Sequence, residues 1–329
     1  MLVIAKRVGV ALITIFIITT LTFFVVRKTP GDVLQAWAMD IVQTYGMTYE
    51  DALAFVTSMY RYDPNQPVLQ QYIDYVSGLL RGDLGQSFIY KVSVNEVIAK
   101  ALPWTLFVTS ISLFLSFSIG MLLGMAIAWK RKTILDPIVT AYASLTGATP
   151  DYVTALVLLI IFAINLRIFP LKGAYDATIT PGFTWPFIKS VLMHAALPIT
   201  AYTFESAAGW ALAMKGSAVS VLGEDYIMAA RARGLKESRI MLRYMGRNAL
   251  LPMITGLAIA MGSMVGGSIL IETIFSYPGI GWFFGEALIK RDYGMMQGLF
   301  LFLATAVIFA NLAADLLYSR LDPRIKLEE

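Results

Sequence analysis

Long apolar runs separated by short polar stretches dominate the 329-residue chain. The first run, residues 8–26, has no charged side chain, and a helix of that length can cross the roughly 30 Å of hydrocarbon in a bilayer. Residues 137–166 contain a Thr149-Pro150-Asp151 interruption, which predicts a kink or a break in that helix. The pattern as a whole predicts six transmembrane helices. They cover residues 8–26, 101–129, 137–166, 197–214, 251–271 and 297–318.

The stretch between the first two predicted spans, residues 27–100, is polar and holds six basic and eight acidic residues. Within it, residues 51–59 and 68–80 show the apolar spacing of helices, so we expect a small helical cap outside the membrane. Basic residues concentrate at the N-terminus, at 130–132 and in a segment before the fifth span. By the positive-inside rule, this bias predicts that both termini lie in the cytoplasm. The loop at 167–196 departs from the bias, with three basic residues against one acidic residue.

The composition is that of a polytopic membrane protein, with 57% hydrophobic and 15% charged residues. The net charge of +4 does not indicate nucleic-acid binding, because the basic residues cluster at the ends of apolar runs. The chain has no cysteine, a single histidine and no HExxH, GxSxG or phosphate-binding glycine motif. We therefore expect no metal, no cofactor and no catalysis by this chain itself.

Residues 215–248, named here the charged segment, hold seven basic and three acidic side chains, an excess equal to the charge of the whole chain. Helical patterns at 224–233 and 236–248 flank Gly234, which predicts a helix, a tight turn and a second helix. Pro252 is expected to end the second helix where the chain enters the membrane. Four basic residues on that helix lie three or four positions apart and predict a basic stripe. They are Lys236, Arg239, Arg243 and Arg247.

A solvated loop that lies against lipid headgroups is one interpretation of the charged segment. A docking site is the other, and two observations favour it. Two short helices set at an angle are more structure than a charge bias requires. The predicted spans also hold few ionisable groups for an ion relay, and the chain has no nucleotide motif, so its energy should come from a partner.

The charged segment resembles the cytoplasmic loop of permease subunits of binding-protein-dependent ABC importers. That loop carries Glu-Ala-Ala, three residues, Gly, and later Leu-Pro; here Ala229-Ala230, Gly234 and Leu251-Pro252 match, and Met228 replaces the glutamate. Such departures are typical of the oligopeptide and dipeptide branch, which this chain resembles end to end. The shared motifs are TPGD at 29–32, GLLRGDLGQSF at 78–88, LP with Thr105 at 102–105, DYIMAARARGL at 225–235, RNALLP at 247–252, ETIFSYPGIG at 272–281, RDY at 291–293, QG at 297–298 and NLAADLLYSRLDPRIK at 311–326.

The resemblance implies an all-α, type I ABC importer permease. Its parts would be a first transmembrane helix at 1–26, an extracytoplasmic cap at 27–100 that faces the binding protein, and a permease core at 101–329 with coupling helices at 224–248. The implied partners are a second homologous permease subunit, two cytosolic ATPase subunits, an extracytoplasmic substrate-binding protein and the lipid of a prokaryotic inner membrane. The residues expected to contact an ATPase are Tyr226, Ala229, Ala230, Arg231, Gly234, Leu235 and Arg239.

Glu205 lies at the centre of the predicted fourth span, where the branch usually has an apolar or small residue. A carboxylate at that depth predicts either a place in the translocation pathway, where it would meet an amine or a hydroxyl of the ligand, or a structural pair with a neighbouring subunit. For the whole protein, import of peptides is the favoured function. The same machine importing short oligosaccharides is the main alternative, and an ion-coupled carrier or a purely structural membrane subunit is a distant one.

Overall fold

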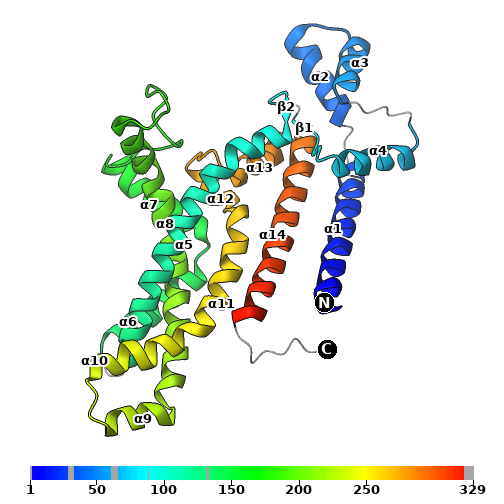
Figure 1. The fold of residues 1–329 in the computed structure, drawn as a ribbon. Coiled ribbons are helices and arrows are strands. Elements are labelled where there is room, and N and C mark those ends of the chain that lie inside the picture. Colours follow the sequence, from blue (N-terminus) through cyan, green and yellow to red (C-terminus); the bar gives the residue numbers. More distant parts are fainter. Residues whose placement is uncertain (1, 29–32, 61–65, 88, 131–132, 322–329) are drawn as a thin grey trace. The chain divides into compact units, whose positions relative to one another are not determined.

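The computed structural model describes residues 2–28, 33–60, 66–87, 89–130 and 133–321 (Figure 1). The TPGD motif at 29–32, the basic residues Arg131 and Lys132, and the end of the chain at 322–329 lie outside the described residues. The chain divides into two compact units. One joins the N-terminal residues up to Leu102 with Phe283–Leu312, and the other is built on Pro103–Trp282.

The first unit contains the predicted first span and the predicted cap. Helix α1 (Leu2–Lys28) includes a candidate span at Lys6–Val25. Its Phe23 is fully buried, with its ring 5.1 Å from that of Tyr72 on α4 (Val68–Leu80), so the cap packs against the span. The cap is helical, as predicted, and α3 and α4 fall where the apolar spacing placed them. Its other elements are α2 (Val33–Tyr45), α3 (Tyr49–Tyr60) and a hairpin of β1 (Gln86–Ser87) and β2 (Val92–Ser93), in which Gln86 pairs with Ser93.

Three of the sequence motifs meet in the first unit. The Ser87 hydroxyl donates a hydrogen bond of 2.6 Å to the buried carboxylate of Asp292, in the RDY motif. The same carboxylate accepts from the Met295 amide at 3.0 Å and so caps the first turn of α14 (Tyr293–Leu321). Gly298 of the QG motif lies so close to the chain that an added Cβ would be 2.4 Å from the Leu84 carbonyl oxygen. These motifs therefore fix the hairpin onto the start of α14.

The second unit is a set of packed helices around α8 (Trp185–Leu222). It begins within α5 (Val94–Trp129), and α5 and α8 approach closely at Gly120 and Gly124. A Cβ at Gly124 would be 2.4 Å from the Ala211 carbonyl oxygen, so only glycine allows this packing. Its other elements are α6 (Leu135–Ala148), α7 (Asp151–Leu158), the π-helix η1 (Leu159–Asn165), α9 (Asp225–Ala232), α10 (Glu237–Arg239), the π-helix η2 (Ile240–Gly246), α11 (Arg247–Ser263), the 3₁₀-helix η3 (Met264–Gly266) and α12 (Ile269–Ile274). Helix α13 (Ile280–Ile289) follows.

The predicted interruption of the third span is confirmed. Helix α6 ends at Ala148, Pro150 adopts an extended conformation, and α7 with η1 leaves at an angle of 103° to α6. Since proline disfavours helical backbone in the residue before it, Thr149 is extended as well. The two halves therefore form a broken span or a re-entrant pair, not one straight crossing.

Among the described residues, four helices are long and apolar enough to cross a membrane, or five spans if the broken pair counts as one. They are Lys6–Val25, Val94–Trp129, Glu237–Gly266 and Tyr293–Ala313. Helix α8, which contains the predicted fourth span, has the length but holds four ionisable residues that lower its hydropathy, namely Lys189, His194, Glu205 and Lys215. The count of six stays a prediction.

Two boundaries differ from those predicted by the sequence. The loop expected to reach about residue 195 ends earlier, because α8 begins at Trp185 with Pro186 in its first turn, where a missing N–H costs nothing. Pro252 does not end a helix either, since it lies inside α11. The predicted second helix of the charged segment therefore continues into the fifth span as one helical stretch from Glu237 to Gly266.

Candidate functional site

The turn at Gly234 is a helix C-terminal motif that glycine makes possible. Helix α9 ends at Ala232, and Gly234 adopts a left-handed φ of +70°. The Gly234 amide donates to the Arg231 carbonyl at 2.9 Å, and the Leu235 amide donates to the Ala230 carbonyl at 3.3 Å. This pair of bonds is the Schellman motif, which satisfies the last carbonyls of a helix. The predicted helix, turn and helix around Gly234 are thus present.

A small apolar core fixes this turn to the rest of the second unit. Ile227, Ala230 and Ile240 are buried together, and the partly buried side chains of Trp129 and Leu235 pack against them. The Arg231 guanidinium lies 5.7 Å from the centre of the Trp129 ring, and its Nε is 3.8 Å from Glu237. These contacts within the chain therefore determine the orientation of α9, while its outer face is exposed.

The residues expected to contact a partner divide into an exposed set and a buried one. Ala230 is 3% exposed, because it forms the floor of the turn, so its side chain faces the inside of the chain and its contact with a partner stays a prediction. Leu235 is partly buried for the same reason. The remaining expected residues are exposed, and Met228, where the related loop carries glutamate, is 60% exposed. The exposed set is Tyr226, Ala229, Arg231, Gly234 and Arg239.

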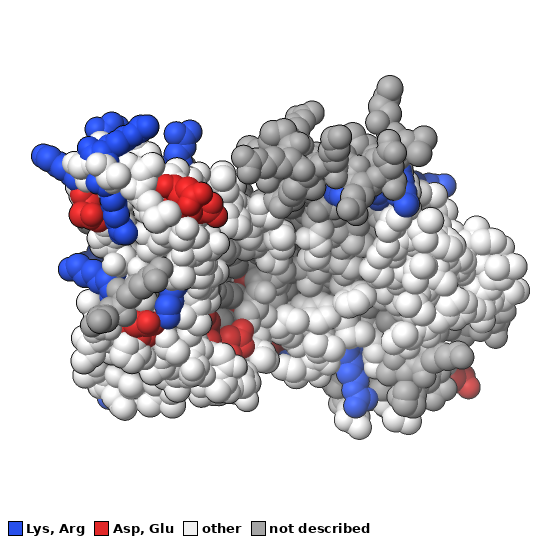
Figure 2. Space-filling model, turned by 90° about the horizontal axis from the view of Figure 1, so that it is seen from below, with Lys and Arg blue, Asp and Glu red and all other residues white. Residues whose placement is uncertain are grey.

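The basic stripe of Lys236, Arg239, Arg243 and Arg247 is exposed at all four positions. Its geometry differs from the predicted regular α-helix, because η2 introduces wider π-helical turns between Ile240 and Gly246. Figure 2 shows Lys and Arg side chains gathered, with acidic side chains among them, at the left, where α9 and α10 lie. We name the outer face of α9, the Gly234 turn and this stripe the docking face.

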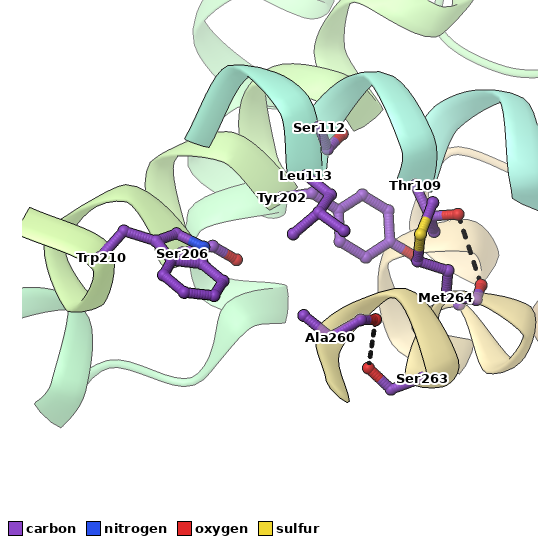
Figure 3. Close-up of a pocket in the computed structure, with 10 residues that line it drawn as sticks. Thr109, Ser112, Leu113, Tyr202, Ser206, Trp210, Ala260, Ser263 and Met264 are labelled. Carbon is purple, nitrogen blue, oxygen red and sulfur yellow. Dashed lines mark hydrogen bonds between the residues drawn. The ribbon is translucent and has the colours of Figure 1, made fainter. Parts of the chain in front are cut away.

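A second feature of the same unit is a pocket of about 260 Å³ between α5, α8, α11 and η3. Figure 3 shows its lining side chains, which converge from these elements. The lining carries hydroxyl groups and a tryptophan but no carboxylate, ammonium or guanidinium group. The residues are Thr109, Ser112, Leu113, Tyr202, Ser206, Trp210, Ala260, Ser263, Met264 and Gly267.

Glu205 lies outside that lining. Its carboxylate accepts a hydrogen bond from the Thr154 hydroxyl of α7, so it connects α8 to α7 within the chain. The Asp151 carboxylate at the start of α7 accepts in turn from the Ser268 hydroxyl, at 2.8 Å. The polar groups of α7 therefore join this half-helix to α8 and to the break between η3 and α12.

The buried carboxylate of Glu272 organises the ETIFSYPGIG motif and is 1% exposed. It accepts hydrogen bonds from the Thr105 hydroxyl at 2.9 Å and from the Trp282 amide at 3.1 Å. The Ile280 amide donates to the Thr105 hydroxyl at 2.8 Å, so the two side chains together cap the start of α13. A Cβ at Gly279 would lie 2.3 Å from the carboxylate, which explains the glycine there. Burial raises the pKa of Glu272 to about 7, although the amide hydrogen bonds oppose it.

A family model described as the inner membrane component of binding-protein-dependent transport systems matches residues 120–327. The chain belongs to this family. The matched region includes the charged segment, α8 and the ETIFSYPGIG motif. As a member of the family the protein is a multi-pass membrane component. The helices that are long and apolar enough to cross a membrane agree with this class.

Relatives of this permease match it almost from end to end. The oligopeptide transport system permease protein OppB of Haemophilus influenzae is 34% identical over 98% of both chains. The di/tripeptide transport system permease protein DppB of Pseudomonas aeruginosa is 31% identical, also over 98% of both chains. A chain from the inward-facing MetNI methionine ABC transporter aligns with a TM-score of 0.54 and 17% identity, covering 69% of this chain and 96% of its own. That likeness concerns the fold alone.

Reasoning from the sequence of this permease missed the pocket. A signal was present, because Thr105, Thr109, Ser112 and Ser116 recur at spacings of 4, 3 and 4 in an otherwise apolar span. That spacing places them on one face of α5. The sequence could not show that Tyr202, Ser206 and Trp210 of α8 would line the same space.

Proposed function

We propose that this chain is the membrane-spanning subunit of an ATP-driven importer, which passes oligopeptides or dipeptides from an extracytoplasmic binding protein into the cytoplasm by alternating access. The observation that carries the proposal is the docking face, which is exposed, basic and held from inside by Ile227, Ala230 and Ile240. The peptide cargo is supported by the relatives, whose names describe peptide permeases over nearly the full length of this chain.

The docking face is the proposed seat of a cytosolic ATPase. A helix whose orientation is fixed by its own core can transmit a movement of its partner to the spans that are continuous with it. Here the part of the charged segment that begins at Glu237 runs without interruption into the span that ends at Gly266, so a displacement at Arg239 moves that span directly. Closure of an ATPase dimer would shift the equilibrium between inward-facing and outward-facing states in this way.

The remaining partners follow from this proposal. A second homologous permease completes the pathway, two ATPase subunits hydrolyse ATP, and the binding protein delivers the peptide on the opposite side. The cap, which includes α2, α3 and α4, faces that binding protein. Both termini and the docking face lie in the cytoplasm of a prokaryotic cell, with the spans in its inner membrane, in agreement with the basic excess of the charged segment.

The function is tested by reconstituting this chain with its partner permease, both ATPases and the binding protein in proteoliposomes. We expect ATP-dependent uptake of radiolabelled trialanine that requires the binding protein. Uptake of labelled maltotriose but of no peptide would show that the cargo is an oligosaccharide and not a peptide. Uptake by the chain alone under an ion gradient would contradict the proposal as a whole.

We propose that Glu205 holds α8 against α7 through Thr154 and does not contact the cargo, because it stands outside the pocket. Glu205→Gln keeps an acceptor for the Thr154 hydroxyl, so we expect trialanine uptake within about twofold of the wild-type rate. Glu205→Leu removes the acceptor and should lower the yield of the assembled complex. A Gln variant that assembles normally but loses uptake would restore Glu205 to the pathway.

A further inference from the structure

The pocket of about 260 Å³ lies among helices predicted to be within the membrane, since α5 and α11 belong to candidate spans. All its lining residues belong to the second unit, so the pocket is formed within one compact body. Its volume is at the small end of ligand sites in proteins, which suits a short stretch of a peptide and not a whole oligopeptide.

The hydroxyl protons of Thr109, Ser112 and Ser263 in the pocket are already used. Thr109 donates to the Thr105 carbonyl at 2.7 Å, Ser112 to the Val108 carbonyl at 2.7 Å, and Ser263 to the Ala260 carbonyl at 2.8 Å. Figure 3 shows the Ser263 bond, and also a longer one from Thr109 to the Met264 carbonyl. Because a hydroxyl has one proton and two lone pairs, these groups are left as hydrogen-bond acceptors. The pocket therefore offers acceptors to a donor such as an amide N–H.

Trp210 supplies a hydrogen-bond donor to the pocket. Its ring packs edge-on against Phe117, with the centroids 5.2 Å apart, and a Cβ at Gly256 would lie 3.2 Å from the indole. Because Gly256 has no side chain, its backbone packs directly against the indole and helps to hold the ring in place. Within the described part of the chain, no residue accepts a hydrogen bond from the indole N–H, which is a donor only. A carbonyl oxygen is the group that it can bind.

From these contacts we propose that the pocket holds an uncharged stretch of the transported peptide by its backbone. Peptide N–H groups bind the oxygens of Thr109, Ser112 and Ser263, and a peptide carbonyl binds the Trp210 indole. The lining holds no charged group, so a lysine or glutamate side chain would lose its hydration there without gaining a partner. The inference rests on the proposed function, because it names the part of the peptide that this chain binds.

The experiment uses the complete transporter in proteoliposomes and two labelled peptides, trialanine and Ala-Lys-Ala. Ser206 is exposed on the pocket wall and can accept a new side chain. Ser206→Asp provides a carboxylate for the lysine ammonium, so we expect the uptake ratio of Ala-Lys-Ala to trialanine to rise about fivefold or more. Ser206→Asn, which has nearly the same shape and no charge, is the matched control and should leave the ratio within about twofold. The binding protein is identical throughout, so any change in the ratio belongs to this chain.

A second pair of variants tests the acceptors without adding charge. The double variant Thr109→Val with Ser112→Ala removes two hydroxyls and should lower trialanine uptake about tenfold, because the peptide N–H groups lose two of their acceptors. Ser116→Ala removes a hydroxyl that also donates to its own helix on α5 but does not line the pocket, and it should leave uptake unchanged. If the pocket does not contact the peptide, the uptake ratio in Ser206→Asp and the trialanine uptake in the double variant both remain at the wild-type value. That result overturns the inference. Failure of the wild-type complex to import any peptide refutes the proposed function instead.

Discussion

Replacing Gly234 with proline is expected to abolish the association of this permease with its ATPase subunits. The backbone at Gly234 has φ of +70°, whereas proline is fixed near −65°. Proline also removes the amide that donates to the Arg231 carbonyl, so the Schellman motif is lost and α9 can no longer pack as it does on Ile240. The ATPase would then meet a displaced docking face. The measurement is the ratio of ATPase subunits to permease after copurification through a tag on the permease, together with peptide-stimulated ATP hydrolysis.

The substitutions at this position can be graded. A Cβ at Gly234 meets no atom within 4 Å, so Gly234→Ala suffers only from its backbone conformation, at about 1–2 kcal/mol, and should retain part of the association. Gly234→Asn should retain more, because asparagine tolerates the left-handed region. The matched control is Gly223→Ala, which makes the same chemical change at a helix end whose φ is −82°. If the proline variant retained ATPase subunits at the wild-type ratio, the docking face would not be the coupling site.

Loss of the Glu272 carboxylate is expected to destabilise the second unit strongly. Glu272→Ala leaves the Trp282 amide and the Thr105 hydroxyl buried without their acceptor, and each unsatisfied group costs about 1–3 kcal/mol. We expect a total loss of about 2–6 kcal/mol, seen as a lower Tm in detergent and a lower yield. Glu96→Ala is the matched control, because that carboxylate is 46% exposed in a surface pair with Lys100 and should have little effect.

The same residue should make stability depend on pH. Glu272 lies beyond the candidate spans, and burial raises its pKa from 4.5 to about 7. The folded state therefore holds the proton more tightly than the unfolded state, so this contribution to stability is complete below pH 4.5 and is lost as the pH rises through about 7. A shift of that size corresponds to about 3 kcal/mol.

Thermal unfolding of the wild type at pH 5 and pH 8 provides the measurement, with Glu272→Gln for comparison. Glutamine can accept from the Trp282 amide but does not titrate, so the part of the pH dependence that arises from Glu272 should disappear in that variant. Equal pH dependence in the wild type and the glutamine variant would show that the carboxylate does not titrate in this range.

The sequence of this protein determined its class and the outline of its helices. A segment that lies in hydrocarbon needs an unbroken run of apolar residues, and this run is visible in the sequence. The first, second and sixth predicted spans therefore lie within α1, α5 and α14. Local rules also sufficed at Thr149-Pro150 and at Gly234, because proline and glycine restrict or permit backbone angles whatever surrounds them. The motifs, through their resemblance to known permeases, also indicated the family to which the chain belongs.

Tertiary structure alone decided which side chains meet. No local rule says that Ala230 lies under Leu235 while Ala229 faces outward, since both alanines have the same propensity for helix. Likewise, Glu272 and Thr105 are 167 positions apart, and only the packing of α5 against α12 makes them one capping unit. The pocket has the same origin, because its hydroxyls and Trp210 come from helices whose relative placement depends on contacts between side chains distant in the sequence. Periodicity describes one helix at a time, whereas the sites of this protein lie between helices.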